Sequence, residues 1–345
     1  MWPEFQPIFC NPHLLTIAGN FWPRKIDEQR FPALRREYRI DENTVVAAFE
    51  HLPETDPKGQ VVLLHGLEGS SEAGYIASFS QEALMRGFAV HRLNMRTCGG
   101  TEHLCETMYH SGLTSDTRAV LEDIRMRGLG PVFAVGFSLG GNVVLKLAGE
   151  LGTTEIIQGA VAVSTPIDLA RSVRAMDKPS NVFYVRGFLD RLRGRVRRKS
   201  QLSPDLYTQD GLDEVKTIWE FDDRFTAPLF GFGTAANYYA TQSAINFLAA
   251  IRVPTLVIAA KDDPLVPFEI YRHPVFDENP ALTLLATEHG GHLGFLSRRK
   301  PRFWLDGVIL TWIERKLEAD LDGRSAGVSE RIDKGISPLS NEARK

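Results

Sequence analysis

Short apolar runs alternate with amphipathic segments along most of this chain. Six of the runs are bounded by glycine, proline or polar residues and have the length of buried strands: 60–64, 88–93, 132–137, 159–164, 254–260 and 282–286. Helices are expected between the early runs, over 73–86 and 115–127. Because strands and helices alternate, the pattern predicts an α/β fold with a mostly parallel central sheet flanked by helices.

The two ends of the chain have other patterns. Residues 1–35 are rich in proline and aromatic side chains without a period, and we expect an N-terminal arm laid over the main domain. Alternating apolar and polar residues over 36–52, broken by a polar turn, predict an antiparallel hairpin that opens the sheet. An apolar stripe predicts a closing helix over 301–317. Residues 321–345 are polar and have no pattern, so we expect a disordered tail.

The strand pattern fails over 166–250, which carries charged, aromatic and amphipathic segments. We interpret this segment as a helical cap or lid inserted between a first part of the core, 36–165, and a second part, 251–320. Phe230 and Phe232 are our candidates for a substrate pocket. They belong to a set of aromatic residues that either attach the insertion to the sheet or line an acyl pocket: Phe183, Phe188, Trp219, Phe225, Phe230, Phe232, Tyr238 and Tyr239.

The composition is that of a soluble globular protein, with 43% hydrophobic and 24% charged residues. A formal net charge of −3 provides no basic footprint for nucleic acid, so nucleic-acid binding is not expected. No run of 18 apolar residues occurs, which argues against a membrane-spanning helix. Glu4 and several prolines stand where a secretory signal would need basic and then apolar residues, and we expect a cytoplasmic protein.

Cysteine usage and one basic run bear on possible ligands. The three cysteines, Cys10, Cys98 and Cys105, cannot all pair and have no metal-ligand spacing, which indicates a reducing compartment and no metal site. No cofactor is expected. The strongly basic run Arg191 to Lys199 has two interpretations, a solvated helix face or a contact with an anionic headgroup, substrate or membrane surface. If the run contacts a membrane surface, the protein would be peripheral to the membrane.

The candidate chemistry begins at a glycine-rich break after the run 132–137. Gly136-Phe137-Ser138-Leu139-Gly140 has the G-x-S-x-G pattern, in which a serine lies on a sharp turn between a strand and a helix. The turn projects the hydroxyl above the sheet, and the glycines avoid collisions with neighbouring backbone. The pattern alone also occurs by chance, but here a strand precedes it and a helix follows. Ser138 is therefore our candidate nucleophile.

A serine hydroxyl is a poor nucleophile at neutral pH and needs a base, which in turn needs a partner that orients it. Asp263 and His292 each follow a predicted strand, so they should lie at the same edge of the sheet as Ser138. The order serine, aspartate, histidine is that of the α/β hydrolases. Two rivals stay open, since Asp262 could replace Asp263 and His289 could replace His292. The residues after Asp263 favour Asp263 over Asp262, and the glycines before His292 favour His292 over His289.

Acyl transfer also needs amide donors for the oxyanion. We expect one donor from Leu139, whose amide lies at the N-terminus of the helix after Ser138. The loop His65-Gly66-Leu67 follows another strand, and we assign the second donor to Leu67. For His65 itself, a structural hydrogen bond that holds the loop is favoured over a chemical role.

Motifs over nearly the whole chain, up to about residue 318, resemble those of the AB hydrolase superfamily and of its YheT-like branch, which also contains mammalian membrane-associated lipid hydrolases: Asn11-Pro12-His13-Leu14-Leu15-Thr16-Ile17, His65-Gly66-Leu67-Glu68-Gly69-Ser70, Asn94-Met95-Arg96-Thr97-Cys98-Gly99-Gly100, Tyr109-His110-Ser111-Gly112, Gly136-Phe137-Ser138-Leu139-Gly140-Gly141-Asn142, Phe221-Asp222 with Thr226-Ala227-Pro228, Tyr238-Tyr239, Asp262-Asp263-Pro264 and Gly290-Gly291-His292-Leu293-Gly294-Phe295. Thr97 departs from the family, where Arg-Gly-Cys is more usual, and this departure concerns the shape of the site. The resemblance implies an α/β-hydrolase fold and hydrolysis of carboxylic esters with a preference for acyl chains. It does not imply one physiological substrate.

Our leading hypothesis is a serine carboxylesterase or lipase-like hydrolase that cleaves small-molecule or lipid-like acyl esters through an acyl-enzyme. Ser138 would attack the carbonyl, His292 would move protons and Asp263 would orient His292, while the amides of Leu67 and Leu139 would hold the oxyanion. An acyltransferase with the same triad is one alternative, because an alcohol or thiol could replace water. A ligand-binding protein that keeps the fold without turnover is another.

Overall fold

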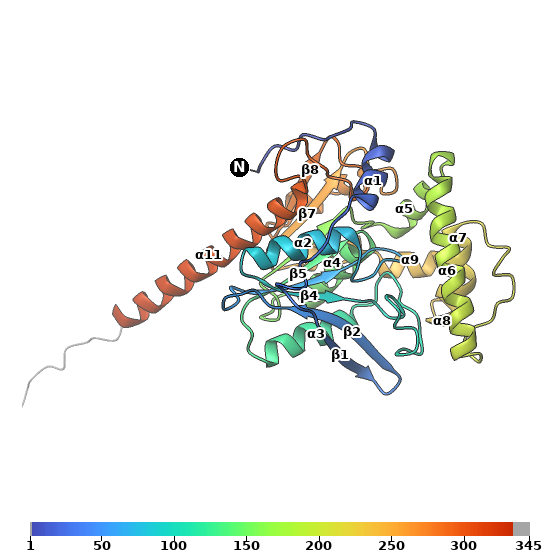
Figure 1. The fold of residues 1–345 in the computed structure, drawn as a ribbon, viewed down its shortest axis with the longest axis horizontal. Helices are drawn as coiled ribbons and strands as arrows, with labels where there is room; N and C mark the ends of the chain where they lie inside the picture. The colour runs from blue at the N-terminus through green and yellow to red at the C-terminus, as the bar shows by residue number, and fades with distance from the viewer. Residues whose placement is uncertain (1, 334–345) are drawn as a thin grey trace, which may run out of the picture.

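An eight-stranded sheet forms the centre of the computed structural model, which describes residues 2–333 and, from residue 320 onward, the backbone alone (Figure 1). The strand order is β1-β2-β4-β3-β5-β6-β7-β8. Strand β2 pairs antiparallel with both β1 and β4, and all other pairs are parallel. The predicted α/β fold and its opening hairpin are therefore confirmed. The strands are β1 (Leu34–Asp41), β2 (Thr44–His51), β3 (Gln60–Leu64), β4 (Ala89–Leu93), β5 (Val132–Phe137), β6 (Gly159–Val163), β7 (Thr255–Ala260) and β8 (Leu282–Thr287).

Helices cover both faces of the sheet because each strand points its side chains alternately to the two faces. The odd-numbered residues of β3 pack in one cluster with α2 (Gly74–Met85) and α11 (Trp304–Asp333). The even-numbered apolar residues of β3 pack in another cluster with α3 (Ser115–Met126) and α4 (Leu139–Leu151). Strands β3 to β7 are consequently buried along their whole length, which explains why they read as continuous, mainly apolar runs.

The N-terminal arm is more regular than its sequence suggested, because it contains helix α1 (Pro12–Phe21). The side chain of Asn11 caps this helix by accepting a hydrogen bond from the amide of Leu14, and a proline follows at the first helical position. This start signal was hidden among prolines that suggested a loop. Elsewhere the arm contacts the main domain, where Phe5 packs against Phe295.

Helix α11 is longer than the predicted helix over 301–317 and continues to Asp333. Residues 321–333 of the expected tail thus belong to this helix in the structure, while residues 334–345 lie outside the described residues. Extending an existing helix costs much less than starting one, so the helix can continue through this stretch although it contains Gly323 and Gly327 besides good helix formers. Neither α11 nor any other helix in the described part of the chain is both long and apolar enough to cross a bilayer.

The segment 166–250, which the structure describes completely, contains helices and turns but no strand. Most of its apolar side chains pack into a cluster of their own, which also includes Met108 and Leu265 from the core. In Figure 1, helices α6, α7, α8 and α9 lie together on one side of the sheet. The elements of the segment are α5 (Leu169–Met176), η1 (Pro179–Asn181), α6 (Val182–Leu202), α7 (Ile218–Phe221), η2 (Asp222–Thr226), α8 (Ala227–Leu229), α9 (Ala235–Gln242), η3 (Ala244–Asn246) and η4 (Leu248–Ala250); η5 (Phe268–Arg272) and α10 (Val275–Glu278) follow before β8.

Candidate active site

Ser138 lies on the sharp turn between β5 and α4, with φ at 52° and ψ at −121°. A positive φ is strained for a residue with a side chain and persists only where the surroundings hold it. The neighbouring glycines allow this turn, since a Cβ atom on Gly136 would lie 2.3 Å from the carbonyl oxygen of Gly140. The amide of Ser138 donates a hydrogen bond to the carbonyl of Val163 at the end of β6. The local sequence therefore produces the turn that the G-x-S-x-G pattern predicts.

Hydrogen bonds join Ser138 to the two partners predicted from the sequence. Nε2 of His292 lies 2.9 Å from Oγ of Ser138, and Nδ1 of His292 lies 2.9 Å from Oδ2 of Asp263. The other carboxylate oxygen of Asp263 accepts hydrogen bonds from the amides of Leu265 and Val266. In this geometry His292 can take the serine proton while Asp263 holds the proton on Nδ1.

The rival residues pair with each other and not with Ser138. Oδ2 of Asp262 lies 3.0 Å from Nδ1 of His289, and Oδ1 of Asp262 accepts a hydrogen bond from the amide of Gly291. Together they brace the loop that leads to His292. The geometry thus favours Asp263 and His292 over Asp262 and His289.

The amides assigned to the oxyanion belong to residues that line the same pocket as Ser138 and His292. The loop of Leu67 approaches Ser138 closely, because a Cβ atom on Gly66 would lie 3.0 Å from Cβ of Ser138. Within the described residues, neither the amide of Leu67 nor that of Leu139 donates a hydrogen bond. Unpaired amides beside a nucleophile are what an oxyanion hole requires.

His65 holds the same loop by both of its ring nitrogens. Nδ1 donates to the carbonyl of Gly66, and Nε2 accepts a hydrogen bond from the amide of Met95. Burial lowers the pKa of His65 to about 4, so its ring is neutral at neutral pH. These contacts agree with the structural interpretation of this histidine.

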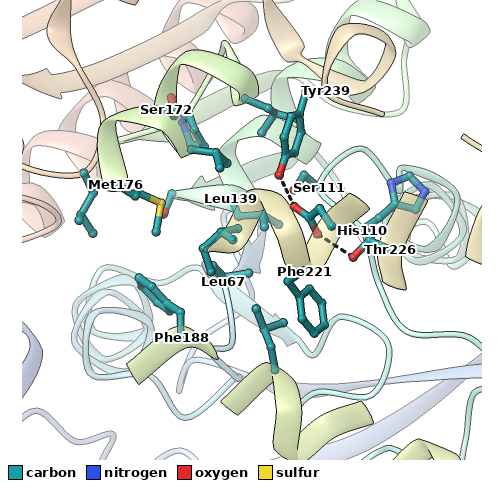
Figure 2. Close-up of a pocket in the computed structure, with 18 of the residues that line it drawn as sticks. Leu67, His110, Ser111, Leu139, Ser172, Met176, Phe188, Phe221, Thr226 and Tyr239 are labelled. Atoms are coloured by element: carbon teal, nitrogen blue, oxygen red, sulfur yellow. Dashed lines mark hydrogen bonds between the residues drawn. The ribbon is translucent and has the colours of Figure 1, made fainter. Parts of the chain in front are cut away.

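A mainly apolar pocket adjoins Ser138 and His292 and extends between the core loops and the segment 166–250 (Figure 2). Phe230 and Phe232 are absent from its lining as the structure describes it, so our choice of these residues for the pocket is corrected. They instead contact the ring of His110, which does line the pocket. The apolar lining comprises Leu67, Met108, Leu139, Pro166, Leu169, Val173, Met176, Phe188, Leu192, Ile218, Phe221, Leu265 and Val266.

The carboxylate of Asp222 also lines the pocket, and we did not expect this residue there from the sequence. Oδ2 of Asp222 accepts a hydrogen bond of 2.5 Å from the hydroxyl of Tyr239, and Oδ1 accepts one of 2.6 Å from that of Thr226 (Figure 2). Burial raises the pKa of Asp222 to about 6. The only sequence signal was the family motif that contains Asp222 and Thr226.

We expect Asp222 to make stability depend on pH. Because its pKa is raised in the folded protein, the folded state keeps a proton that the unfolded chain has already lost. The contribution of Asp222 to the free energy of unfolding is therefore greatest below about pH 4. It falls by up to about 3 kcal/mol as the pH rises through about 6. Chemical denaturation between about pH 4 and 8 should show this loss in the wild type but not in Asp222→Asn. Identical pH profiles for the two proteins would contradict the assignment.

Helix α1 supports the loop of His292 in a way that the sequence did not reveal. Oγ1 of Thr16 accepts a hydrogen bond from the amide of His292 and donates one to the carbonyl of Pro12. A Cβ atom on Gly291 would lie 2.5 Å from that same carbonyl oxygen, so the loop rests directly on the helix. The arm therefore helps to place His292.

Most side chains of the basic run 191–199 are engaged within the protein. The predicted solvated helix face describes part of this run, since Arg191, Arg197 and Arg198 are exposed. Arg195 and Lys199 are instead buried. Arg195 even lines the pocket. The pairings are Arg193 with the carbonyls of Leu212 and Val215, Arg195 with Glu68, Arg197 with Asp213, Arg198 with Glu102 and Lys199 with the carbonyl of Cys105.

Comparison with known proteins agrees with this geometry. The sequence profile of the α/β hydrolase fold family matches residues 59–298. The chain is 33% identical to Escherichia coli YheT, over 92% of this chain and 94% of that protein. It is 30% identical to a monoacylglycerol lipase of Saccharomyces cerevisiae, over 73% of this chain and 58% of the yeast protein.

Among solved structures, the Pyrococcus furiosus esterase Pf2001 has the same fold, with a TM-score of 0.54 and 17% identity over 91% of this chain and 99% of that chain. The sheet, the matched profile and the relatives all indicate one family. This chain belongs to the α/β hydrolase fold family, in its YheT-like branch, and is an esterase- or lipase-like hydrolase.

Proposed function

We propose that this protein hydrolyses carboxylic esters of apolar acyl chains through an acyl-enzyme formed on Ser138. The observation that carries the proposal is the continuous chain of hydrogen bonds from Ser138 through His292 to Asp263 beside an apolar pocket. The yeast relative named monoacylglycerol lipase supports lipid-like esters as the substrate class.

In the proposed reaction, Oγ of Ser138 bonds to the carbonyl carbon of the ester while its proton passes to Nε2 of His292. The carbonyl oxygen becomes an oxyanion, which the amides of Leu67 and Leu139 stabilise. The bond to the alcohol oxygen then breaks, and His292 gives its proton to the departing alcohol. Water attacks the acyl-enzyme with the same help from His292, which releases the carboxylic acid and restores Ser138.

We also propose that residues 166–250 act as a cap that holds the acyl chain. Helices α5, α6 and α7 of this segment contribute most of the apolar lining, including Val173, Met176 and Phe188. Each methylene of the chain buried there would contribute about 0.8 kcal/mol of binding free energy. Chain-length preference should therefore depend on this segment.

A panel of p-nitrophenyl esters of graded acyl length tests the proposed function. The wild type should hydrolyse these esters to free acid and should lose activity when a fluorophosphonate labels Ser138. Transfer of the acyl group to an added alcohol in place of water would instead support the acyltransferase. A protein that neither hydrolyses the esters nor reacts with the probe would be a ligand-binding member of the fold.

The corrected pocket predicts which aromatic side chain governs chain length. Phe188→Ala removes a ring that lines the pocket, so the preferred acyl chain should become longer. The ratio of kcat/KM between successive chain lengths should change by about fourfold for each methylene gained or lost. Phe232→Ala is the matched control, because this half-buried ring lies in the same segment but outside the lining, and it should leave the profile unchanged. If Phe232→Ala alone shifted the chain-length profile, Phe232 would line the acyl pocket as we first expected.

A further inference from the structure

An ion pair between Arg195 and Glu68 joins helix α6 to the loop that carries Leu67. Nε and Nη2 of Arg195 lie 3.0 Å and 2.9 Å from Oε1 and Oε2 of Glu68, which makes the contact bidentate. The side chains of Arg195 and Glu68 are only 6% and 1% exposed. Removing either partner would leave the other as a buried unpaired charge, so the contact holds the two elements firmly together.

Further hydrogen bonds complete the network around this ion pair. The hydroxyl of Tyr109 donates to Oε1 of Glu68 and accepts from the amide of Glu68. Nη1 of Arg195 donates to the carbonyl and to the hydroxyl of Thr97, in the loop after β4. Glu68 and Thr97 have φ values of 54° and 63°, which a residue with a side chain adopts only under constraint. One guanidinium group of α6 therefore holds two strained loops of the core.

The anchored residues lie on both sides of the Leu67 amide. On one side, the amide of Gly66 donates to the hydroxyl of Tyr75. On the other side, Glu68 is held by Arg195 and by Tyr109. The N–H group of Leu67 thus belongs to a peptide between two fixed points, although it makes no hydrogen bond of its own within the described residues. An oxyanion donor needs such support, since small displacements of a donor reduce catalysis strongly.

We propose that Arg195 and Glu68 are positioning residues that hold the Leu67 amide where the oxyanion forms. The inference rests on the proposed function and assigns the segment 166–250 a part in catalysis beyond binding the acyl chain. Movement of α6 away from the core would break the ion pair and release the Leu67 loop. The enzyme would then reach full activity only with this helix in place.

Glu68→Gln tests the proposal with little change in shape. With p-nitrophenyl esters, kcat should fall by about 10-fold to 100-fold, while KM changes little. This decrease is no larger than the decrease in kcat that follows the removal of one oxyanion donor. Titration with a fluorophosphonate measures the fraction of reactive protein, and each rate is divided by this fraction. A matched thionoester provides the diagnostic readout, because sulfur is a weak hydrogen-bond acceptor and gains little from the oxyanion amides. Its rate should fall several-fold less than that of the oxygen ester.

A double variant separates positioning from folding. Arg195→Met alone leaves the Glu68 charge buried, so its melting temperature should fall; Arg195→Met with Glu68→Gln removes both charges and should recover part of that stability. We expect kcat to stay low in the double variant. Arg197→Met is the control on the same helix, because its ion pair with Asp213 is exposed, and it should retain wild-type kcat.

The outcomes distinguish this inference from the proposed function. If the oxygen ester and the thionoester lose rate equally, or if kcat recovers together with the melting temperature, the pair is only structural and the inference is overturned. If the wild type hydrolyses no ester, the proposed function fails and the inference fails with it.

Discussion

Ser138→Ala is expected to lower kcat for ester hydrolysis by about 10⁶-fold, the size of effect known for the nucleophile of well-studied serine hydrolases. The variant lacks the oxygen that would form the proposed acyl-enzyme, so His292 and Asp263 would have no hydroxyl to activate. The fold should survive, because alanine keeps the Cβ atom and no structural hydrogen bond depends on Oγ apart from the contact with His292 within the described residues. Steady-state hydrolysis of a p-nitrophenyl ester and thermal unfolding measure the two effects.

Ser80→Ala is the matched control for this substitution. Ser80 is also buried, and its hydroxyl donates to the carbonyl of Ile76 within α2, away from the pocket lining. It should change stability slightly and leave kcat within a few-fold of the wild type. If Ser138→Ala kept more than a tenth of wild-type turnover, another residue would have to be the nucleophile.

Asp263→Asn is expected to lower kcat by about 10⁴-fold, as in serine proteases with the same substitution. The carboxylate accepts the proton on Nδ1 of His292 and so leaves Nε2 free to accept the proton of Ser138. An asparagine amide can donate to Nδ1, which places the imidazole proton on Nε2, where it blocks that transfer. Rates of the purified variant at several pH values, with its thermal stability, measure the loss.

Asp262→Asn gives the comparison at the adjacent carboxylate. Its oxygens bind His289 and the amide of Gly291, so the substitution weakens a brace of the His292 loop and should cost far less turnover. If Asp262→Asn proved the more damaging of the two, the roles of Asp262 and Asp263 would have to be exchanged.

The predicted strands were accurate because their residues face a sheet that is covered on both sides. A short, mainly apolar run bounded by glycine, proline or polar residues is typical of a buried strand in such a fold, and the runs at 60–64 and 132–137 coincide with β3 and β5. The candidate triad could be named for a related reason, since residues that follow parallel strands must meet at one edge of the sheet. Ser138, Asp263 and His292 all follow this rule.

Features that depend on a side chain's direction were not predictable in this way. Phe188 lines the pocket while Phe230 and Phe232 pack beside His110, and nothing in their aromatic character separates them. The basic run shows the same limit, because Arg195 and Arg197 lie on one short stretch of α6 but point to a buried and an exposed partner. The sequence of a basic run does not show which of its side chains form ion pairs with carboxylates in a distant loop.

The sequence by itself determined the α/β class, the turn at Ser138 and the order of the candidate triad, because these follow from local periodicity and from the rule that parallel strands share one carboxyl edge. Only the tertiary structure decided that Asp263, and not Asp262, bonds to His292, that α1 supports the loop of that histidine, and that Arg195 reaches Glu68 across 127 positions of the chain. Each of these is a contact between segments far apart in sequence. Packing alone brings such segments together, and no local pattern encodes it.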